Sequence, residues 1–141
     1  MKSDYLKYWR VIRYFIKAKY NLNTQELDML LFLNSEQYFD IGRFKEFDNL
    51  LSWDKHRFYK LLKKGWIEKF RKGQNGLRTV YCLSYKTKRL IKSVYNKLEG
   101  EEIPTSKTHN PMFAKNVCYS DKVYRNMIIE MNKFITTTTS F

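Results

Sequence analysis

The stretch that decides the fold runs from residue 53 to residue 92 and reads WDKHRFYKLLKKGWIEKFRKGQNGLRTVYCLSYKTKRLIK. A helical pattern of apolar and basic residues comes first and stops at Gly65, the residue type that usually follows a helix end. Asn75-Gly76 then marks a tight turn between two further apolar segments. These forty residues hold thirteen Lys and Arg against two acids, which gives them +11 of the formal net charge of +13. A basic block confined to one region of a folded chain is typical of nucleic-acid binding.

This stretch and the residues just before it predict a helix-turn-helix followed by a wing. Residues 44–51 and 53–64 are the two expected helices, with Ser52 as the N-cap of the second. Residues 66–71 and 77–83 are the two expected strands of the hairpin. Short helices followed by a hairpin are the winged helix-turn-helix pattern. The expected fold class is therefore mainly α with a small β-hairpin, a winged helix-turn-helix with extra N- and C-terminal helices.

The other expected helices are indicated by apolar residues that recur at helical spacing. They cover residues 4–20, 24–34, 85–98 and 121–135, with an edge strand or extended link at 38–42. Asn23 and Glu26 form a capping-box signature at the start of the second helix. The expected inward stripe of that helix is Leu27, Leu30, Leu31 and Asn34.

The segments group into four expected parts. They are a winged-helix domain with its N-terminal helix (1–98), a linker or arm (99–119), a C-terminal helix for dimerisation or assembly (120–135) and a tail (136–141), which we expect to fray.

The expected helix at 53–64 divides into an apolar side and a basic side at 100° per residue. In a helix-turn-helix the second helix lies in the major groove and its N-terminal residues meet base edges. A hairpin tip of Gly, Gln and Asn fits a narrow groove. The expected DNA-binding residues are therefore Lys55, His56, Arg57, Tyr59, Lys60, Lys63, Lys64, Arg71, Lys72, Gln74, Asn75 and Arg78. The alternative is that both elements are ordinary solvated surfaces.

Four short motifs also follow the order of a known family. Leu22-Asn23-Thr24 with Glu26-Leu27 opens one helix, and Asp54-Lys55 opens the basic helix. Leu61-Leu62 and then KKGWIE at 63–68 lead into the wing, and LSYKTK at 83–88 leads into the next helix. In these motifs residues 22–91, about half of the chain, resemble the MarR family of winged-helix regulators.

The resemblance implies a homodimer whose first and last helices interlock, so that two recognition helices read a pseudo-palindromic site in double-stranded DNA. It implies a transcription regulator, most simply a repressor that occludes its site. No residue here specifies a small-molecule effector. The segment from Asp54 to Gly65 is about one helical turn shorter than is usual in the family. The wing also lacks the family's Asp-Arg tip, with Asn75 and Arg78 near its place.

Composition argues against several other classes. Cys82 and Cys118 lie far apart and are interpreted as reduced thiols. No apolar run approaches the roughly 18 residues of a membrane span, and the N-terminus lacks the apolar region of a signal peptide. We expect a cytoplasmic protein, in a bacterium or a virus-infected host cell. Because His56 and His109 have no metal-ligand spacing with the cysteines and no glycine-rich phosphate loop is present, we expect no enzyme activity, metal or cofactor.

Two further hypotheses stay open at this point. One is a structural module of a viral or mobile-element complex, in which the arm wraps a neighbour. It rests on the segment Asn110-Pro111-Met112-Phe113, whose apolar pair is expected to face solvent. The other is a replication- or RNA-associated winged helix without site preference, for which Tyr59 and Tyr81 are the candidates to stack on bases.

Overall fold

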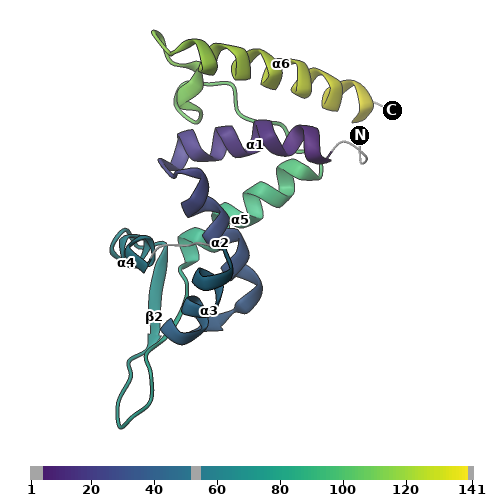
Figure 1. Cartoon of the computed structure of the whole chain (residues 1–141). Helices are drawn as coiled ribbons and strands as arrows, with labels where there is room; N and C mark the ends of the chain where they lie inside the picture. The colour runs from purple at the N-terminus through teal and green to yellow at the C-terminus, as the bar shows by residue number, and fades with distance from the viewer. Residues whose placement is uncertain (1–4, 52–54, 140–141) are drawn as a thin grey trace. The chain divides into compact units, whose positions relative to one another are not determined.

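The computed structural model describes residues 5–51 and 55–139, which fold into two compact units. The sheet-containing unit comprises residues 23–91. The terminal unit comprises residues 1–22 together with residues 92–141. The N-terminal helix therefore groups with the C-terminal segments, whereas the sequence placed it with the winged helix. The expected fold class, mainly α with a small antiparallel sheet, is confirmed (Figure 1).

The sheet-containing unit follows the order expected of a winged helix. Its elements are α2 (Thr24–Leu33), a short 3-10 helix (Asn34–Glu36), β1 (Tyr38–Phe39), α3 (Ile41–Leu51), α4 (Lys55–Lys63), β2 (Ile67–Arg71), β3 (Val80–Leu83) and the first half of α5 (Tyr85–Leu98). The three strands are antiparallel, with β3 between β1 and β2. Of the two possibilities for residues 38–42, the edge strand is the one that forms, over two residues.

The start of α2 is fixed by its capping box, as predicted. The Glu26 N–H donates to Asn23 Oδ1 at 2.7 Å, and the Asn23 N–H donates to Glu26 Oε1 at 3.1 Å. The predicted inward stripe is only partly right. The buried apolar residues of α2 are Leu27, Met29, Leu30 and Leu33, whereas Leu31 is half-buried and Asn34 is exposed. Asn34 turns outward because α2 ends at Leu33 and the chain tightens into the 3-10 helix.

The helix α3 begins three residues earlier than predicted, because Asp40 caps it. The Arg43 N–H donates to Asp40 Oδ1 at 2.8 Å, and the Phe44 N–H donates to the Asp40 carbonyl at 3.1 Å. These bonds satisfy N–H groups that a helix start leaves without partners. The two residues 41–42, assigned to the extended link by sequence, therefore belong to the first turn of α3.

An aromatic cluster around Phe58 joins α3, α4 and the sheet. The Phe58 side chain has no exposed surface. Its ring centroid lies 4.7 Å from that of Phe44 on α3, 5.1 Å from that of Tyr81 on β3 and 6.2 Å from that of Phe39 on β1. Edge-on and tilted ring pairs at such distances are favourable. This cluster fixes the buried side of α4 and therefore also the side that α4 exposes.

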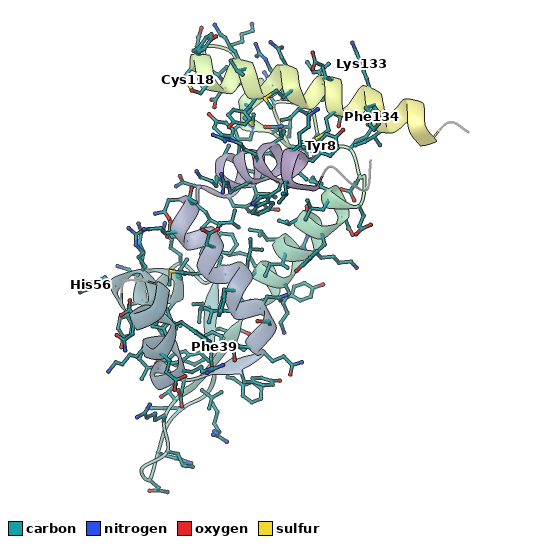
Figure 2. All side chains as sticks on the ribbon, turned by 45° about the vertical axis from the view of Figure 1, so that its right-hand side comes forward. Tyr8, Phe39, His56, Cys118, Lys133 and Phe134 are labelled. Atoms are coloured by element: carbon teal, nitrogen blue, oxygen red, sulfur yellow. The ribbon has the colours of Figure 1, made fainter. Side chains whose placement is uncertain are left out.

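The terminal unit is built on two helices that run in opposite directions. They are α1 (Tyr5–Tyr20) and α6 (Tyr119–Thr139), which lie side by side (Figure 1). The α6 helix starts before residue 121 and continues through the predicted tail as far as Thr139. In Figure 2, Tyr8 lies on the side of α1 that faces Phe134 of α6. The second half of α5 and a short 3-10 helix (Pro111–Phe113) belong to the same unit.

One end of the α1–α6 pair is held by two tyrosines. The Tyr14 and Tyr124 rings are stacked, with centroids 3.9 Å apart and planes inclined by 10°. The Tyr14 hydroxyl donates to Asp121 Oδ1 at 2.5 Å. Burial, followed by this bond to a carboxylate, raises the pKa of Tyr14 far above its ordinary value. The phenol therefore stays protonated as a donor throughout the neutral range.

The arm is packed onto its own unit, contrary to the expectation that Met112 and Phe113 face solvent. Met112 is fully buried and Phe113 is half-buried. The buried Asn110 donates from Nδ2 to the Pro104 carbonyl at 2.8 Å. Asn132 of α6 pairs with both backbone groups of Ile103, accepting from its N–H at 3.0 Å and donating to its carbonyl at 2.8 Å. The arm thus closes back on α6.

Replacing Asn132 by alanine is expected to lower the free energy of unfolding by about 1–3 kcal/mol, because both backbone groups of Ile103 lose their partner. Urea unfolding measures the change. Asn126→Ala is the matched control, since Asn126 is exposed on the same helix, and its effect is expected to stay within about 0.5 kcal/mol. Equal stability of the two variants would show that Asn132 does not hold the arm.

Candidate nucleic-acid interface

The helix α4 presents one buried side and one exposed, mainly basic side. Phe58 and Leu61 have no exposed surface. His56, Tyr59, Lys60 and Lys63 are exposed, and Figure 2 shows His56 projecting outward from α4. The division follows from helical spacing, which places residues three and four apart on the same side. Donors and positive charge are therefore collected on the side of α4 that the core does not use.

Four residues named from the sequence differ from this group. Ser52 and Asp54 lie outside the described residues, and so does the side chain of Lys55. Arg57 is half-buried at the border of the exposed side.

Lys64, which directly follows α4, is exposed, and its ammonium lies near a buried carboxylate. Its Nζ lies 3.9 Å from Glu26 Oε2, and the Glu26 side chain is 3% exposed. That Oε2 has no hydrogen-bond partner among the described residues. A buried carboxylate without a nearby cation is strongly unfavourable. Lys64 is thus placed as a counter-charge for this carboxylate of α2, while its own side chain stays 38% exposed.

The end of α4 is tied to α5. Gly65 takes a positive φ of 84°, and the N–H groups of Gly65 and Trp66 donate to the carbonyls of Leu62 and Leu61 at 3.2 and 3.0 Å. This is the Schellman arrangement of a helix end. The Lys86 ammonium donates to the Lys64 carbonyl at 3.0 Å and lies 4.0 Å from the centroid of the Trp66 ring. Lys86 therefore stabilises the exit from α4.

The hairpin loop is longer than the sequence predicted. β3 starts at Val80, so residues 77–79 belong to the loop and not to a strand. The register slips between Lys69 and Arg71, which leaves Phe70 as a bulge. At the tip, Asn75 and Gly76 both have positive φ, 52° and 82°. Figure 1 shows this hairpin projecting from the body of its unit.

The polar side chains predicted for DNA contact on the hairpin fall into two groups. Four lie along the loop, and the fifth, Arg78, reaches back toward α3. Arg71, Lys72, Gln74 and Asn75 are all exposed along the projecting loop. Arg78 is also exposed, but its guanidinium lies against Gly42 at the start of α3, where an added Cβ would collide with it. The Arg78 backbone lies beside Gly73 in the loop, and its guanidinium reaches back to the start of α3.

The charge of this surface is not neutralised from within. Among residues 5–51 and 55–139, no ion pair involves Lys60, Lys63, Arg71 or Lys72. Two nearby acids are engaged elsewhere, because Arg43 pairs with Glu36 at 3.1 Å and with Glu46 at 2.8 Å. The exposed cations of α4 and the loop therefore carry positive charge that no ion pair among the described residues compensates.

Three aromatic side chains near this surface have distinct environments. Tyr81 is buried in the Phe58 cluster, so it has no face for a nucleobase. Tyr59 is 44% exposed, and its ring meets Phe58 edge-on with centroids 5.6 Å apart. Phe70 is 59% exposed and packs on Tyr38, with ring centroids 4.5 Å apart. The sequence did not identify this last pair, because the bulge that turns Phe70 outward has no clear signal.

The remaining chemistry of the chain is sparse in the part that the structure describes. No three His, Cys, Asp or Glu side chains there come close enough to hold a metal ion. Cys82 is buried, and burial, followed by the neighbouring Glu68, raises the pKa of its thiol. Within the described ranges, no helix combines the length and apolar character that crossing a bilayer demands.

Comparison of the chain with models of protein families, with curated proteins and with solved structures finds no match.

Proposed function

We propose that this protein binds double-stranded DNA at specific sites as a dimeric, MarR-like transcription regulator, and that it represses by occluding its site. The observation that carries the proposal is the exposed basic side of α4 together with the basic projecting hairpin in one unit. Among the described residues its key cations form no ion pairs. DNA is the polyanion whose grooves fit a helix and an adjacent loop.

In this proposal α4 enters the major groove. His56 and Tyr59 lie in its N-terminal half, where base edges are read, and Lys60 and Lys63 meet phosphates further along the helix. Arg71 and Lys72 hold the hairpin against the backbone. Gln74 and Asn75 reach the neighbouring minor groove with amide donors and acceptors. A role on DNA would be exercised in the cytoplasm of a bacterium or of a virus-infected cell.

The proposed dimer uses the terminal unit. Its helices expose large apolar side chains, namely Leu6, Val123, Ile129 and Phe134, at 87%, 38%, 36% and 44%. A second copy would bury such surface, and a two-fold arrangement would present two α4 helices to a palindromic site. The assembly-module alternative has lost its main support, since Met112 of the arm is fully buried in its own unit.

The proposal is tested by selecting bound duplexes from a random library and then titrating salt against the enriched site. We expect log affinity to fall linearly with log salt, by about 0.9 per phosphate contact. We also expect an enriched palindrome, with half-sites about 10 base pairs apart. A salt slope without an enriched site would replace the regulator by an architectural DNA binder. No duplex binding at 50 mM salt would refute a DNA-binding role.

A further inference from the structure

The tip of the hairpin carries an apolar side chain that no packing inside the unit explains. Leu77 is 62% exposed, although it follows directly on the turn formed by Asn75 and Gly76. Its neighbours along the loop, Gln74 and Asn75, are polar and exposed. A large apolar group held in water is unfavourable, and a partner that removes it from water gains affinity. The question is what kind of partner the loop can reach.

The backbone holds Leu77 at a defined place instead of letting it collapse onto the strands. The Leu77 N–H donates to the Gln74 carbonyl at 3.0 Å, which closes the turn. The Gly73 N–H donates to Thr79 Oγ1 at 3.0 Å, which joins the two sides of the loop below the tip. Leu77 is therefore positioned by hydrogen bonds on both sides of the turn.

The loop is also narrow. A Cβ added at Gly73 would lie 2.7 Å from the Thr79 nitrogen, closer than side chains tolerate, so the two sides of the loop run in contact. A Cβ added at Gly76 would meet nothing within 4 Å. The loop is narrow, its two sides are joined by a hydrogen bond, and its end is uncrowded at Gly76. Such a loop can carry one apolar side chain into a groove that is too narrow for a helix.

The charges of the hairpin restrict the choice of partner. Lys69, Arg71 and Lys72 are exposed on it, whereas its acid, Glu68, accepts a weak bond from Cys82 on the central strand. The partner must therefore combine a polyanionic rim with an apolar interior behind a narrow opening. The minor groove of duplex DNA has these properties, because phosphates line its edges and an apolar side chain can enter between the stacked base pairs behind its floor.

We propose that Leu77 is an apolar wedge that enters the minor groove and partly unstacks one base step, which bends the duplex. This inference rests on the proposed DNA-binding function. It also predicts a preference for pyrimidine–purine steps such as TA at the contacted position, because those steps unstack most easily. Specificity would then come from DNA deformability as well as from base contacts by α4.

The test compares Leu77→Ala with Tyr95→Ala, a control at a similarly exposed large side chain on α5, where Tyr95 is 57% exposed against 62% for Leu77. The probes are duplexes carrying 2-aminopurine at a central TA step, and the same duplexes labelled at both ends for energy transfer. We expect the unaltered protein to raise 2-aminopurine fluorescence and shorten the end-to-end distance. Leu77→Ala should lose both signals and bind on the order of tenfold more weakly, with an unchanged salt slope because its cations remain.

Leu77→Phe should retain the unstacking signal, since phenylalanine also serves as a wedge. The inference is overturned if the unaltered protein binds duplex without unstacking, or if Leu77→Ala unstacks and binds like Tyr95→Ala. Either result would make a protein the candidate partner of Leu77, and the proposed DNA-binding function would still stand. If no variant and no unaltered protein binds duplex at 50 mM salt, the proposed function itself fails, and the wedge fails with it.

Discussion

Phe58→Ala is expected to lower the free energy of unfolding by about 3–5 kcal/mol, the range measured when a fully buried phenylalanine is truncated. The Phe58 ring contacts aromatic rings from β1, α3 and β3. Its removal therefore leaves a cavity where three elements meet, and the rigid rings around it relax only in part. Small domains have a free energy of unfolding of about 5–15 kcal/mol. This one substitution would therefore remove a large share of it. Urea unfolding followed by tryptophan fluorescence gives the value.

The matched control for Phe58→Ala is Phe70→Ala in the same unit. Phe70 is 59% exposed, and its ring packs on that of Tyr38. Its truncation should cost about 1 kcal/mol, the value of a single exposed ring pair. If the two alanine variants unfold at the same urea concentration, the cluster around Phe58 is not the core of this unit. A loss confined to Phe58→Ala ties the orientation of α4 to that cluster.

The sequence predicted those parts of the fold that are encoded by local patterns. Gly65 ends α4, and the capping box of Asn23 and Glu26 starts α2, because both signals act through backbone groups within a few residues. The helix at 85–98 was predicted with its observed bounds. The basic side of α4 was also predictable, since helical spacing alone separates Phe58 and Leu61 from Lys60.

The missed features depend on contacts between residues far apart in the chain. Asn132 closes on Ile103, which is 29 positions away, and no local pattern shows that Met112 becomes buried. Lysine is a typical surface residue type, yet the ion-pair partner of Lys64 is the buried carboxylate of Glu26 on another helix. Arg78 rests on Gly42, 36 positions earlier in the chain. In each case the packing of separate elements decided the role of the residue.

Leu77 shows the same limit within the candidate site. Its apolar side chain beside Asn75-Gly76 was interpreted as the first residue of a strand, which alternation and turn chemistry favour. The bulge at Phe70 and the bond between Gly73 and Thr79 instead keep residues 77–79 out of the sheet. The most distinctive residue of the loop was therefore hidden by a strand boundary that was three residues too early.

Reversing two charges on α4, Lys60→Glu with Lys63→Glu, is expected to weaken duplex binding on the order of a hundredfold to a thousandfold at low salt. Both side chains are exposed, and neither forms an ion pair among the described residues. Reversal thus removes two phosphate contacts and adds repulsion in their place. The neutral pair Lys60→Gln with Lys63→Gln should weaken binding less and lower the salt slope by about 1.8, at 0.9 per contact.

The matched control for the charge reversal is Lys107→Glu with Lys115→Glu. These two lysines are exposed in the arm, and their reversal changes the net charge by the same amount. If the overall charge of the chain drives association, both double variants will lose affinity alike and their salt slopes will match. If α4 lies in the groove, the arm variant will keep most of its affinity, because its two lysines belong neither to α4 nor to the hairpin. The comparison therefore distinguishes binding driven by the net charge of the whole chain from binding driven by the lysines of α4. Only a loss of affinity confined to the α4 variant is compatible with α4 as the element that reads DNA.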